Sequence, residues 1–535
     1  MKRIAALLLF FVMGALPAGC QGDGTGEKTT SATFKSMTTQ QTGKGYRQYG
    51  DTGGLRIPVV DKPVTVSWML SSDVLNLNDK PVIKEIEKRT GVKVDVQAVP
   101  SASYEDKVRM VLASGKLPDI TEGIPYGELN TLGAQGVFVA INKYADVLPN
   151  FQRLYMQENT WVMKSYADDQ GNIYIWPVYQ LSRDVNHGFL YRKDIFDKYG
   201  IKEWDNTDEF YQALKKLKGI FPDSFPYASK TQQYIFRDWS YGWGLGNDSF
   251  FPMYFDERTE KWKLATIQPE FKEMIDFMKK LYKEGLLDPE FITDTQASWT
   301  SKMTSEDRAF VTYDWIGRLD MFYNQAREKI PGYDLRYGNP IGPTGRIESF
   351  NKILNFGTAV ANNNRKEAAL KMMDYLTSPS GAELITLGIK DEEFIFDSSG
   401  KVVYPELKDL PKVDISTLTN KFGCWLESMY LNVDKRSVYF NYSEKEQEAQ
   451  YKILKGNKLE PVDPILRFTD DESATIAELQ AVLGKAGIEF AAKYVMDGSY
   501  GDVQWNEWLE KADKLEVGRL EDDYNTAQKR YDDIR

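Results

Sequence analysis

The chain has 535 residues, of which 78 are acidic and 67 basic, giving a formal net charge of −11. This length exceeds what one hydrophobic core usually organises, so we expect two domains. The negative charge repels phosphate backbones, which argues against nucleic acid as a partner. Aromatic residues make up 13% of the chain, with 12 Trp and 31 Tyr, and their rings either fill cores or form flat platforms for flat ligands.

Thiol and imidazole groups are scarce. The chain has two cysteines, Cys20 and Cys424, and one histidine, His187. If Cys20 carries lipid, Cys424 has no partner for a disulfide, and so few soft ligands argue against structural zinc. His187 stands in no catalytic motif, and we interpret it as a loop or cleft-edge histidine. We expect neither a metal nor a cofactor.

The N-terminus has the pattern of an export signal. Two basic residues precede an apolar stretch, residues 4–15, that is too short to span a bilayer comfortably. The next segment, Leu16-Pro17-Ala18-Gly19-Cys20, resembles the lipobox of bacterial lipoproteins, although Pro17 stands where that family usually has Leu. The resemblance implies a signal peptide over residues 1–19 and a mature chain anchored by lipid, palmitate included, at Cys20. The alternative is an ordinary secretory signal with an incidental cysteine.

A low-complexity segment follows. Residues 21–54 are rich in Gly, Thr, Ser and Gln and have almost no aliphatic side chains. Such a segment cannot bury enough apolar surface to fold. We therefore predict that residues 20–57 comprise the lipidated cysteine and a flexible linker, which lets the folded part stand off the membrane.

The folded part begins with alternating strands and helices. Residues 64–70 and residues 92–98 alternate apolar and polar side chains, as strands do. A helix is predicted between them, starting near Pro81 and ending at Gly91. This βαβ pattern predicts a parallel sheet. A second helix and then a short strand over residues 117–120 follow.

Two loops come directly after predicted strands, Ser71–Asp73 and Thr121–Gly123. Ligands bind at the carboxyl ends of the strands in open α/β sheets, so we expect both loops to border a cleft. Ordinary turn chemistry is the alternative interpretation of these residues.

A series of later segments carries a family resemblance. The run Asp169-Gln170-Gly171-Asn172-Ile173-Tyr174-Ile175-Trp176-Pro177 and the run Tyr191-Arg192-Lys193-Asp194-Ile195-Phe196 resemble stretches of the family 1 extracellular solute-binding proteins, whose best-known fold is that of maltose-binding protein. Further similar segments lie at residues 269–290, 364–388, 388–403 and 497–524, the last two being typical of a lipoprotein subgroup linked to complex polysaccharides. The order and spacing of these segments extend the resemblance over about residues 58–535.

The resemblance implies both a fold and a function. The fold is α/β, two-lobed and periplasmic-binding-protein-like (type II), with a ligand cleft between hinge-linked lobes. The N-lobe would comprise residues 58–176 and 343–390, and the C-lobe, with a C-terminal helical extension, residues 177–342 and 391–535. The function is that of a monomeric lipoprotein that binds a solute on the extracellular face of the cell membrane and delivers it to the permease subunits of an ABC transporter.

Sugars have polar edges and apolar faces, so their sites combine aromatic rings with planar polar groups. Clusters of such residues predict a ligand-binding set of Trp68, Ser72, Tyr179, Arg183, Arg237, Trp239, Trp243, Asp314 and Trp315. The resemblance gives Trp315 the role of a stacking ring and Arg183 that of a polar contact. Trp425 and Glu427 form a further candidate pair. Core packing is the alternative for each tryptophan.

The subgroup resemblance implies an oligosaccharide ligand from a complex polysaccharide. Arg183, Arg237 and Arg318 can pair with sugar carboxylates, so we expect a uronic-acid-containing, pectin-type fragment. Related alginate-binding proteins have an Asp-x-Asn-x-Asn calcium loop. The matching residues 218–226 offer Asp223 alone as an acidic ligand, and we expect no calcium there.

Two other function classes stay open at this point. A secreted carbohydrate-active enzyme needs two carboxylates at the scissile bond, and no motif marks such a pair among the 78 acidic residues. A polysaccharide adhesin would hold its ligand without transport or lobe closure. We favour the binding protein and expect no catalytic residue.

Overall fold

The computed structural model describes residues 49–180, 183–246, 253–410, 413–439 and 442–534. The predicted signal peptide, Cys20 and most of the predicted linker lie outside the described residues. The chain divides into two compact units, the first comprising the residues up to Glu122 with Asn363–Asn441, and the second Gly123–Asn362 with Tyr442–Arg535. Relative to the predicted lobes, residues 123–176 and 343–362 fall in the second unit and residues 391–441 in the first.

The first unit contains a parallel sheet with helices from both of its chain segments. Its elements are β1 (Val64–Ser71), α2 (Pro81–Thr90), β2 (Val92–Val99), α3 (Tyr104–Ser114), β3 (Ile120–Thr121), α13 (Lys366–Thr377), α14 (Pro379–Leu387), β12 (Ile395–Phe396), β13 (Val402–Val403), α15 (Ile415–Phe422) and α16 (Lys435–Tyr439).

The predicted βαβ unit is confirmed. β1 pairs in parallel with β2, Val64 opposite Val92, and with β3, Trp68 opposite Ile120. Pro81 is the first residue of α2, a position whose amide has no partner within the helix, so a residue without an amide hydrogen fits there. Gly91 ends the helix with a φ of 76°. The short third strand lies at Ile120–Thr121 instead of residues 117–120.

The second unit is larger and mostly helical. Its elements are α4 (Tyr126–Ala134), α5 (Pro149–Phe151), α6 (Trp161–Tyr166), β4 (Val178–Tyr179), β5 (His187–Arg192), α7 (Lys193–Lys198), α8 (Thr207–Ile220), α9 (Ile235–Ser240), β6 (Met253–Asp256), β7 (Lys261–Leu264), α10 (Pro269–Lys283), α11 (Gln296–Met303), β8 (Val311–Trp315), α12 (Arg318–Ala326), β9 (Leu335–Tyr337), β10 (Ile353–Leu354), β11 (Ala359–Val360), α17 (Glu444–Lys455), α18 (Asp470–Met496), α19 (Asp502–Lys514) and α20 (Val517–Asp533).

An antiparallel sheet in the order β8-β5-β9 positions the residues of greatest interest in this unit. On β5 and β8, His187 lies opposite Trp315 and Gly188 opposite Asp314. Gly188 is required here, because a Cβ atom at this position would lie 1.9 Å from the Tyr337 hydroxyl oxygen. That hydroxyl donates to the backbone carbonyl of His187 over 2.8 Å, which fixes the start of β5.

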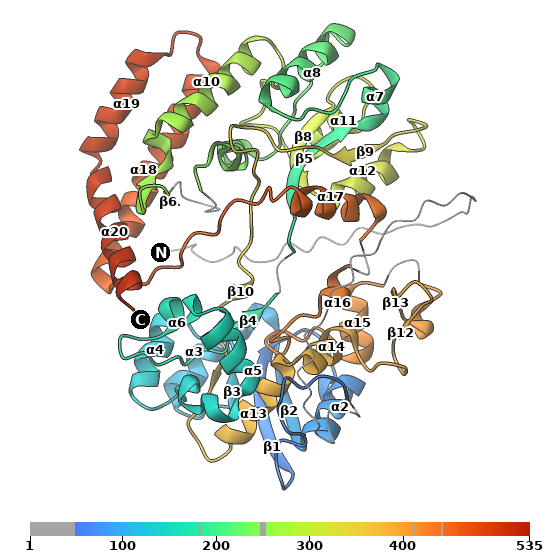
Figure 1. Cartoon of the computed structure of the whole chain (residues 1–535), viewed down its shortest axis with the longest axis vertical. Helices are drawn as coiled ribbons and strands as arrows, with labels where there is room; N and C mark the ends of the chain where they lie inside the picture. The colour runs from blue at the N-terminus through green and yellow to red at the C-terminus, as the bar shows by residue number, and fades with distance from the viewer. Residues whose placement is uncertain (1–48, 181–182, 247–252, 411–412, 440–441, 535) are drawn as a thin grey trace. The chain divides into compact units, whose positions relative to one another are not determined.

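The C-terminal helices belong to the core of the second unit. α10 packs against α18, and α18 against α20 (Figure 1). Trp508 on α19 donates its indole hydrogen to the carbonyl of Thr266, and Trp262 on β7 donates to Gln528 on α20. These tryptophans are structural. Among the helices of the described chain, none combines the length and the apolar character needed to cross a bilayer.

Candidate functional site

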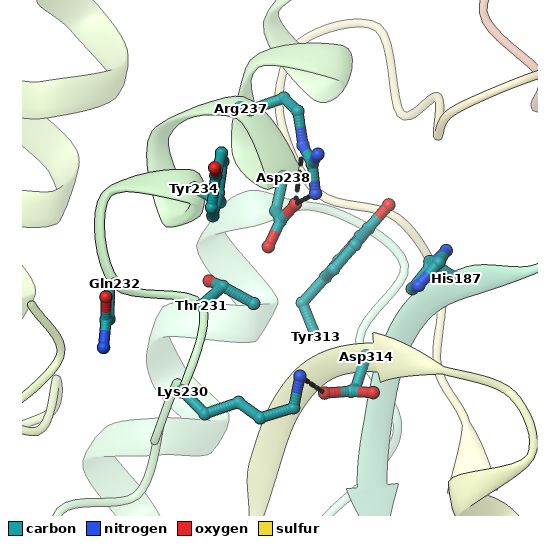
Figure 2. A pocket seen from close by; sticks show the side chains of 9 residues that line it. All are labelled: His187, Lys230, Thr231, Gln232, Tyr234, Arg237, Asp238, Tyr313 and Asp314. Atoms are coloured by element: carbon teal, nitrogen blue, oxygen red, sulfur yellow. Dashed lines mark hydrogen bonds and ion pairs between the residues drawn. The ribbon is translucent and has the colours of Figure 1, made fainter. Parts of the chain in front are cut away.

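A pocket of about 390 Å³ lies in the second unit, at the ends of β5 and β8. Its residues come from these two strands, from the loop before α9 and from α9 itself (Figure 2). They are His187, Lys230, Thr231, Gln232, Tyr234, Arg237, Asp238, Tyr313 and Asp314.

Asp314 holds two cations in place at one side of this pocket. Its carboxylate is 3% exposed, and its Oδ2 atom lies 2.8 Å from Lys230 Nζ. Its Oδ1 atom accepts a hydrogen bond from Arg318 Nε over 3.2 Å. A buried carboxylate between two cations is well compensated, so the arrangement fixes Lys230 at the pocket wall (Figure 2).

A second ion pair lies across the pocket. Arg237 Nη2 and Nε both donate to Asp238 Oδ1, over 2.7 and 3.2 Å. Burial opposes the positive charge, but the neighbouring acidic groups, Asp238 foremost, raise the pKa of Arg237 above its usual value. The guanidinium also lies 5.2 Å from the ring centre of Tyr234. Arg237 therefore stays charged and is held in one orientation.

His187 and Glu348 adjoin these ion pairs. His187 Nδ1 lies 3.6 Å from Glu348 Oε2, and Glu348 accepts a hydrogen bond from the Tyr241 hydroxyl over 3.3 Å. Burial lowers the pKa of His187, although Asp314 opposes the shift. Burial also raises the pKa of Glu348 to about 7. At neutral pH the imidazole is mostly uncharged and Glu348 is only partly ionised.

The pocket therefore combines fixed charges, hydroxyl groups and aromatic rings. The rings of His187 and Tyr313 are parallel, with an interplanar angle of 3° and centres 6.5 Å apart. Within the described chain the Tyr313 hydroxyl has no hydrogen-bond partner although it is buried. Such a set of donors and acceptors suits a ligand rich in hydroxyl groups.

The comparisons with known proteins identify the family. A model of the bacterial extracellular solute-binding protein family matches residues 77–383. The chain belongs to this family.

Its relatives include three proteins of Bacillus subtilis (strain 168). It is 24% identical to the polygalacturonan/rhamnogalacturonan-binding protein YtcQ, over 98% of this chain and 99% of the relative. It is 24% identical to lipoprotein LipO, over 79% of this chain and 84% of that relative. It is 23% identical to the melibiose/raffinose/stachyose-binding protein MelE, over 39% of this chain and 46% of that relative.

Solved structures confirm the predicted fold class. Alginate-binding protein AlgQ2 without calcium ion has a TM-score of 0.60 and 22% identity, with 88% of this chain and 99% of that chain covered. An extracellular solute-binding protein from Bifidobacterium longum subsp. infantis has a TM-score of 0.67 and 17% identity, with 88% of this chain and 98% of that chain covered. This solute-binding protein therefore has the α/β, two-lobed, periplasmic-binding-protein-like fold.

Three of the predicted site residues lie at or beside the pocket. Arg237 and Asp314 line it, and Trp315 follows Asp314 at the end of β8. Trp315 is half-buried, and its ring lies against Gly317, where a Cβ atom would come within 2.3 Å of it. The ring also packs against the hydrophobic core of this unit, and Trp315 is not among the residues that line the pocket, so its stacking role stays a prediction.

For three other tryptophans the structure favours the core-packing alternative. Trp239 is 1% exposed and donates to the Tyr227 hydroxyl over 2.9 Å. Trp243 is buried beside it, with the two ring centres 6.2 Å apart. Trp68 is fully buried in the first unit. Their rings fill space between elements, so no ring face is free for a sugar.

The remaining predicted residues are not among those that line this pocket. The Arg183 guanidinium lies 4.9 Å from the ring centre of Tyr442, and its Nη1 is 3.9 Å from Glu446. Tyr179 on β4 pairs with Ile353. Ser72 follows β1 in the first unit, and its hydroxyl accepts a hydrogen bond from the Val74 amide.

The sequence did not point to several pocket residues, among them Lys230, Thr231 and Tyr234. Lys230 and Asp314 are 84 positions apart, and no motif connects them. His187, interpreted as a loop or cleft-edge residue, is the first residue of β5 and lines the pocket. The useful signal would have been the pairing of β5 with β8, which only the folded structure supplies.

Two lysines occupy positions where a cation could bind. Lys302 Nζ lies 2.8, 2.6 and 2.9 Å from carboxylate oxygens of Asp288, Glu290 and Asp294, a group close enough together to hold a metal ion. In the segment of residues 218–226, Lys218 Nζ donates to the carbonyl of Ser224 over 2.7 Å. The Lys302 ammonium group is thus paired with all three carboxylates, and the Lys218 ammonium group satisfies the loop carbonyl.

Proposed function

We propose that this protein captures an oligosaccharide outside the cell and delivers it to the permease subunits of an ABC transporter. The observation that carries the proposal is the pocket of the second unit, where oriented charges, hydroxyl groups and rings line about 390 Å³. This combination matches the edges and faces of sugars. The names of the relatives support it, because YtcQ and MelE are named for binding polysaccharide or oligosaccharide and a Streptococcus pneumoniae relative is named as a carbohydrate ABC transporter substrate-binding protein.

In this proposal Trp315 stacks on an apolar sugar face, and Arg237 and Asp314 form hydrogen bonds with sugar hydroxyl groups. The protein releases the ligand to the permease chemically unchanged. The lobes close around it, as in the family that the chain belongs to.

We also propose that the ligand contains a uronic acid unit. Of the residues that line the pocket, Lys230 and Arg237 carry positive charges and Asp238 and Asp314 carry the opposing ones. Arg318, which is outside the lining, is a third cation and pairs with Asp314. Glu348, with a pKa of about 7, adds only part of a charge at neutral pH. A sugar carboxylate would bind to Lys230 or Arg237 at the pocket wall.

The protein acts as a monomer held at the extracellular face of the membrane by lipid on Cys20. The relative LipO, which is named as a lipoprotein, supports the anchor. Mass spectrometry of the mature N-terminus tests it. We expect an acylated Cys20 as the first residue, and cleavage at any other position would contradict the anchor without affecting the binding function.

A thermal-shift screen of the mature protein against neutral and acidic oligosaccharides of equal length tests the proposed function. A ligand that binds only the native state raises the melting temperature. We expect at least one oligosaccharide to raise it and monosaccharides to have little effect. A screen in which no sugar changes the melting temperature would count against the proposal.

A further inference from the structure

Glu348 adjoins the pocket of the second unit but is not among the residues that line it. It belongs to the segment between β9 and β10 and is 9% exposed. Its Oε2 atom lies 3.6 Å from Nδ1 of His187, which does line the pocket (Figure 2). Its Oε1 atom accepts a hydrogen bond from the Tyr241 hydroxyl over 3.3 Å. A single side chain, that of His187, thus connects this buried carboxyl to the pocket.

The titratable groups that act on Glu348 come from several elements of the unit. They are His187 of β5, Arg237 and Asp238 of α9, Tyr241 of the turn that follows α9, Tyr313 of β8 and Tyr337 of β9. Burial raises the pKa of each of the three tyrosines and lowers the pKa of His187, so these four groups are mostly uncharged at neutral pH. Arg237 is thus the one full positive charge in this set.

Arg237 already has an acidic partner. Its Nη2 atom lies 2.7 Å from Asp238 Oδ1. Glu348 therefore shares one cation with Asp238, and the negative charge of Asp238 opposes its ionisation. Burial opposes ionisation further, and the pKa of Glu348 is raised to about 7. A ligand carboxylate at the pocket wall would be a third anion beside the same cation.

The charge of Glu348 reaches the pocket lining. Tyr313 lines the pocket, and after burial the negative charge of Glu348 contributes most to the raised pKa of its hydroxyl. Within the described chain that buried hydroxyl has no hydrogen-bond partner, so it is available to a ligand. Lys230 and Asp314 act on His187 with opposite signs and are paired with each other over 2.8 Å. They therefore do not cancel the effect of Glu348 on this side of the pocket.

We propose that Glu348 determines how strongly the pocket binds acidic sugars: its neutral form leaves Arg237 to a sugar carboxylate, and its ionised form repels that carboxylate. The inference rests on the proposed function and deepens it by assigning a regulation to the same pocket. Glu348 acts through Arg237 and His187 and determines specificity without lining the pocket. Acidic ligands therefore bind more tightly in mildly acidic surroundings, whereas neutral ligands bind independently of pH.

Binding of an acidic ligand should take up protons. A carboxylate placed near Glu348 favours the protonated form of Glu348, and a reaction that takes up protons becomes weaker as the pH rises. Because the pKa of Glu348 is about 7, the association constant of an acidic ligand should fall about tenfold between pH 6 and pH 8. At pH 7 the uptake should be about half a proton per ligand.

Isothermal titration of the full mature protein tests the inference with two probes of equal length, tetragalacturonate (acidic) and stachyose (neutral). Titrations at pH 7 in phosphate and in Tris, buffers with different ionisation enthalpies, give the number of protons taken up on binding. We expect about half a proton for tetragalacturonate and none for stachyose. Dissociation constants at pH 6 and pH 8 give the accompanying change in affinity.

Glu348→Gln preserves the shape of the side chain and cannot ionise. We expect this variant to bind tetragalacturonate without proton uptake and with the same affinity at pH 6 and pH 8. Glu460→Gln is the matched control, because Glu460 is a buried carboxyl of the same unit whose pKa is also raised to about 7. Its charged neighbours are outside the pocket lining, namely Arg346, Asp463 and Glu257. We expect proton uptake in this variant to equal that of the wild type.

Two results would overturn the inference and leave the proposed function standing. One is proton uptake that persists in Glu348→Gln, which would assign the proton to another group such as His187. The other is a wild-type affinity for tetragalacturonate that is the same at pH 6 and pH 8, or no binding of tetragalacturonate while stachyose binds. This second result needs no variant, so it decides the question even if the melting temperature shows that Glu348→Gln is unfolded. If neither probe binds the wild type, the proposed function fails for these sugars and the inference fails with it.

Discussion

At the residue scale, Trp315 and Trp239 show what sequence can and cannot tell about an aromatic side chain. Both stand in clusters of rings and polar residues, which predicted both as sugar platforms. The structure leaves Trp315 half-buried beside the pocket and buries Trp239 against Tyr227. What separates them is the packing of α9 against distant segments, and no local pattern records it.

The two tryptophans predict opposite variant behaviour. Trp315→Ala should weaken oligosaccharide binding by about tenfold or more, because a stacking ring is lost, with little change in melting temperature. Trp239→Ala should lower the free energy of unfolding by about 3–5 kcal/mol, because it leaves a cavity in the core. Calorimetric titration and urea unfolding measure the two effects. The assignment fails if Trp315→Ala is the destabilising variant and binds normally.

At the element scale, local signals predicted the ends of elements better than their pairing. Pro81 and Gly91 bound α2 as predicted, and the Asn206 side chain accepts a hydrogen bond from the amide of Glu209 at the start of α8. In contrast, the antiparallel register of β5 with β8 joins residues that are 120 to 128 positions apart. That register, which positions His187 and Asp314, depends on tertiary packing.

Lys302 on α11 joins its helix to the segment that follows α10. Burial lowers the pKa of Lys302, but its bonds to Asp288, Glu290 and Asp294 outweigh burial and raise it above the usual value. Lys302→Met should leave two buried carboxylates without a counter-charge and destabilise the protein by about 3–5 kcal/mol in urea unfolding. Lys283→Met, at an exposed position of α10, is the control. Equal stability of the two variants would show that the ion cluster contributes nothing.

At the scale of the whole molecule, buried carboxyls make stability depend on pH. Burial raises the pKa of Glu122 to about 8 and those of Glu348 and Glu393 to about 7. Between about pH 5 and pH 8 the native state therefore binds more protons than the unfolded state, and the free energy of unfolding falls as the pH rises. Urea midpoints at pH 5, 7 and 9 should decrease in that order.

Glu348→Gln provides the check on this assignment, because a glutamine cannot ionise. The decrease in the urea midpoint between pH 5 and pH 9 should be smaller in the variant than in the wild type. A midpoint that rises with pH would contradict the raised pKa values. Carboxyls whose pKa is lowered, such as Asp256, lose their stabilising effect only in more acidic solution.

The order of similar segments along the chain predicted the family and the fold class, because many weak matches in sequence order are jointly specific. The ligand was less predictable, since it depends on which charges the fold brings together. Arg183 and Arg237 were predicted as carboxylate ligands, yet each lies beside an acidic side chain of its own unit. The charge available to a ligand is the surplus that remains after such pairing.

Isothermal titration of the wild-type protein with an oligosaccharide from the screen, followed by mass spectrometry of the recovered sugar, tests the central claim most directly. The account predicts saturable binding at one oligosaccharide per protein and recovery of the sugar at its original mass. Shortened sugar in more than stoichiometric amount, or no binding by any oligosaccharide of the panel, would contradict it.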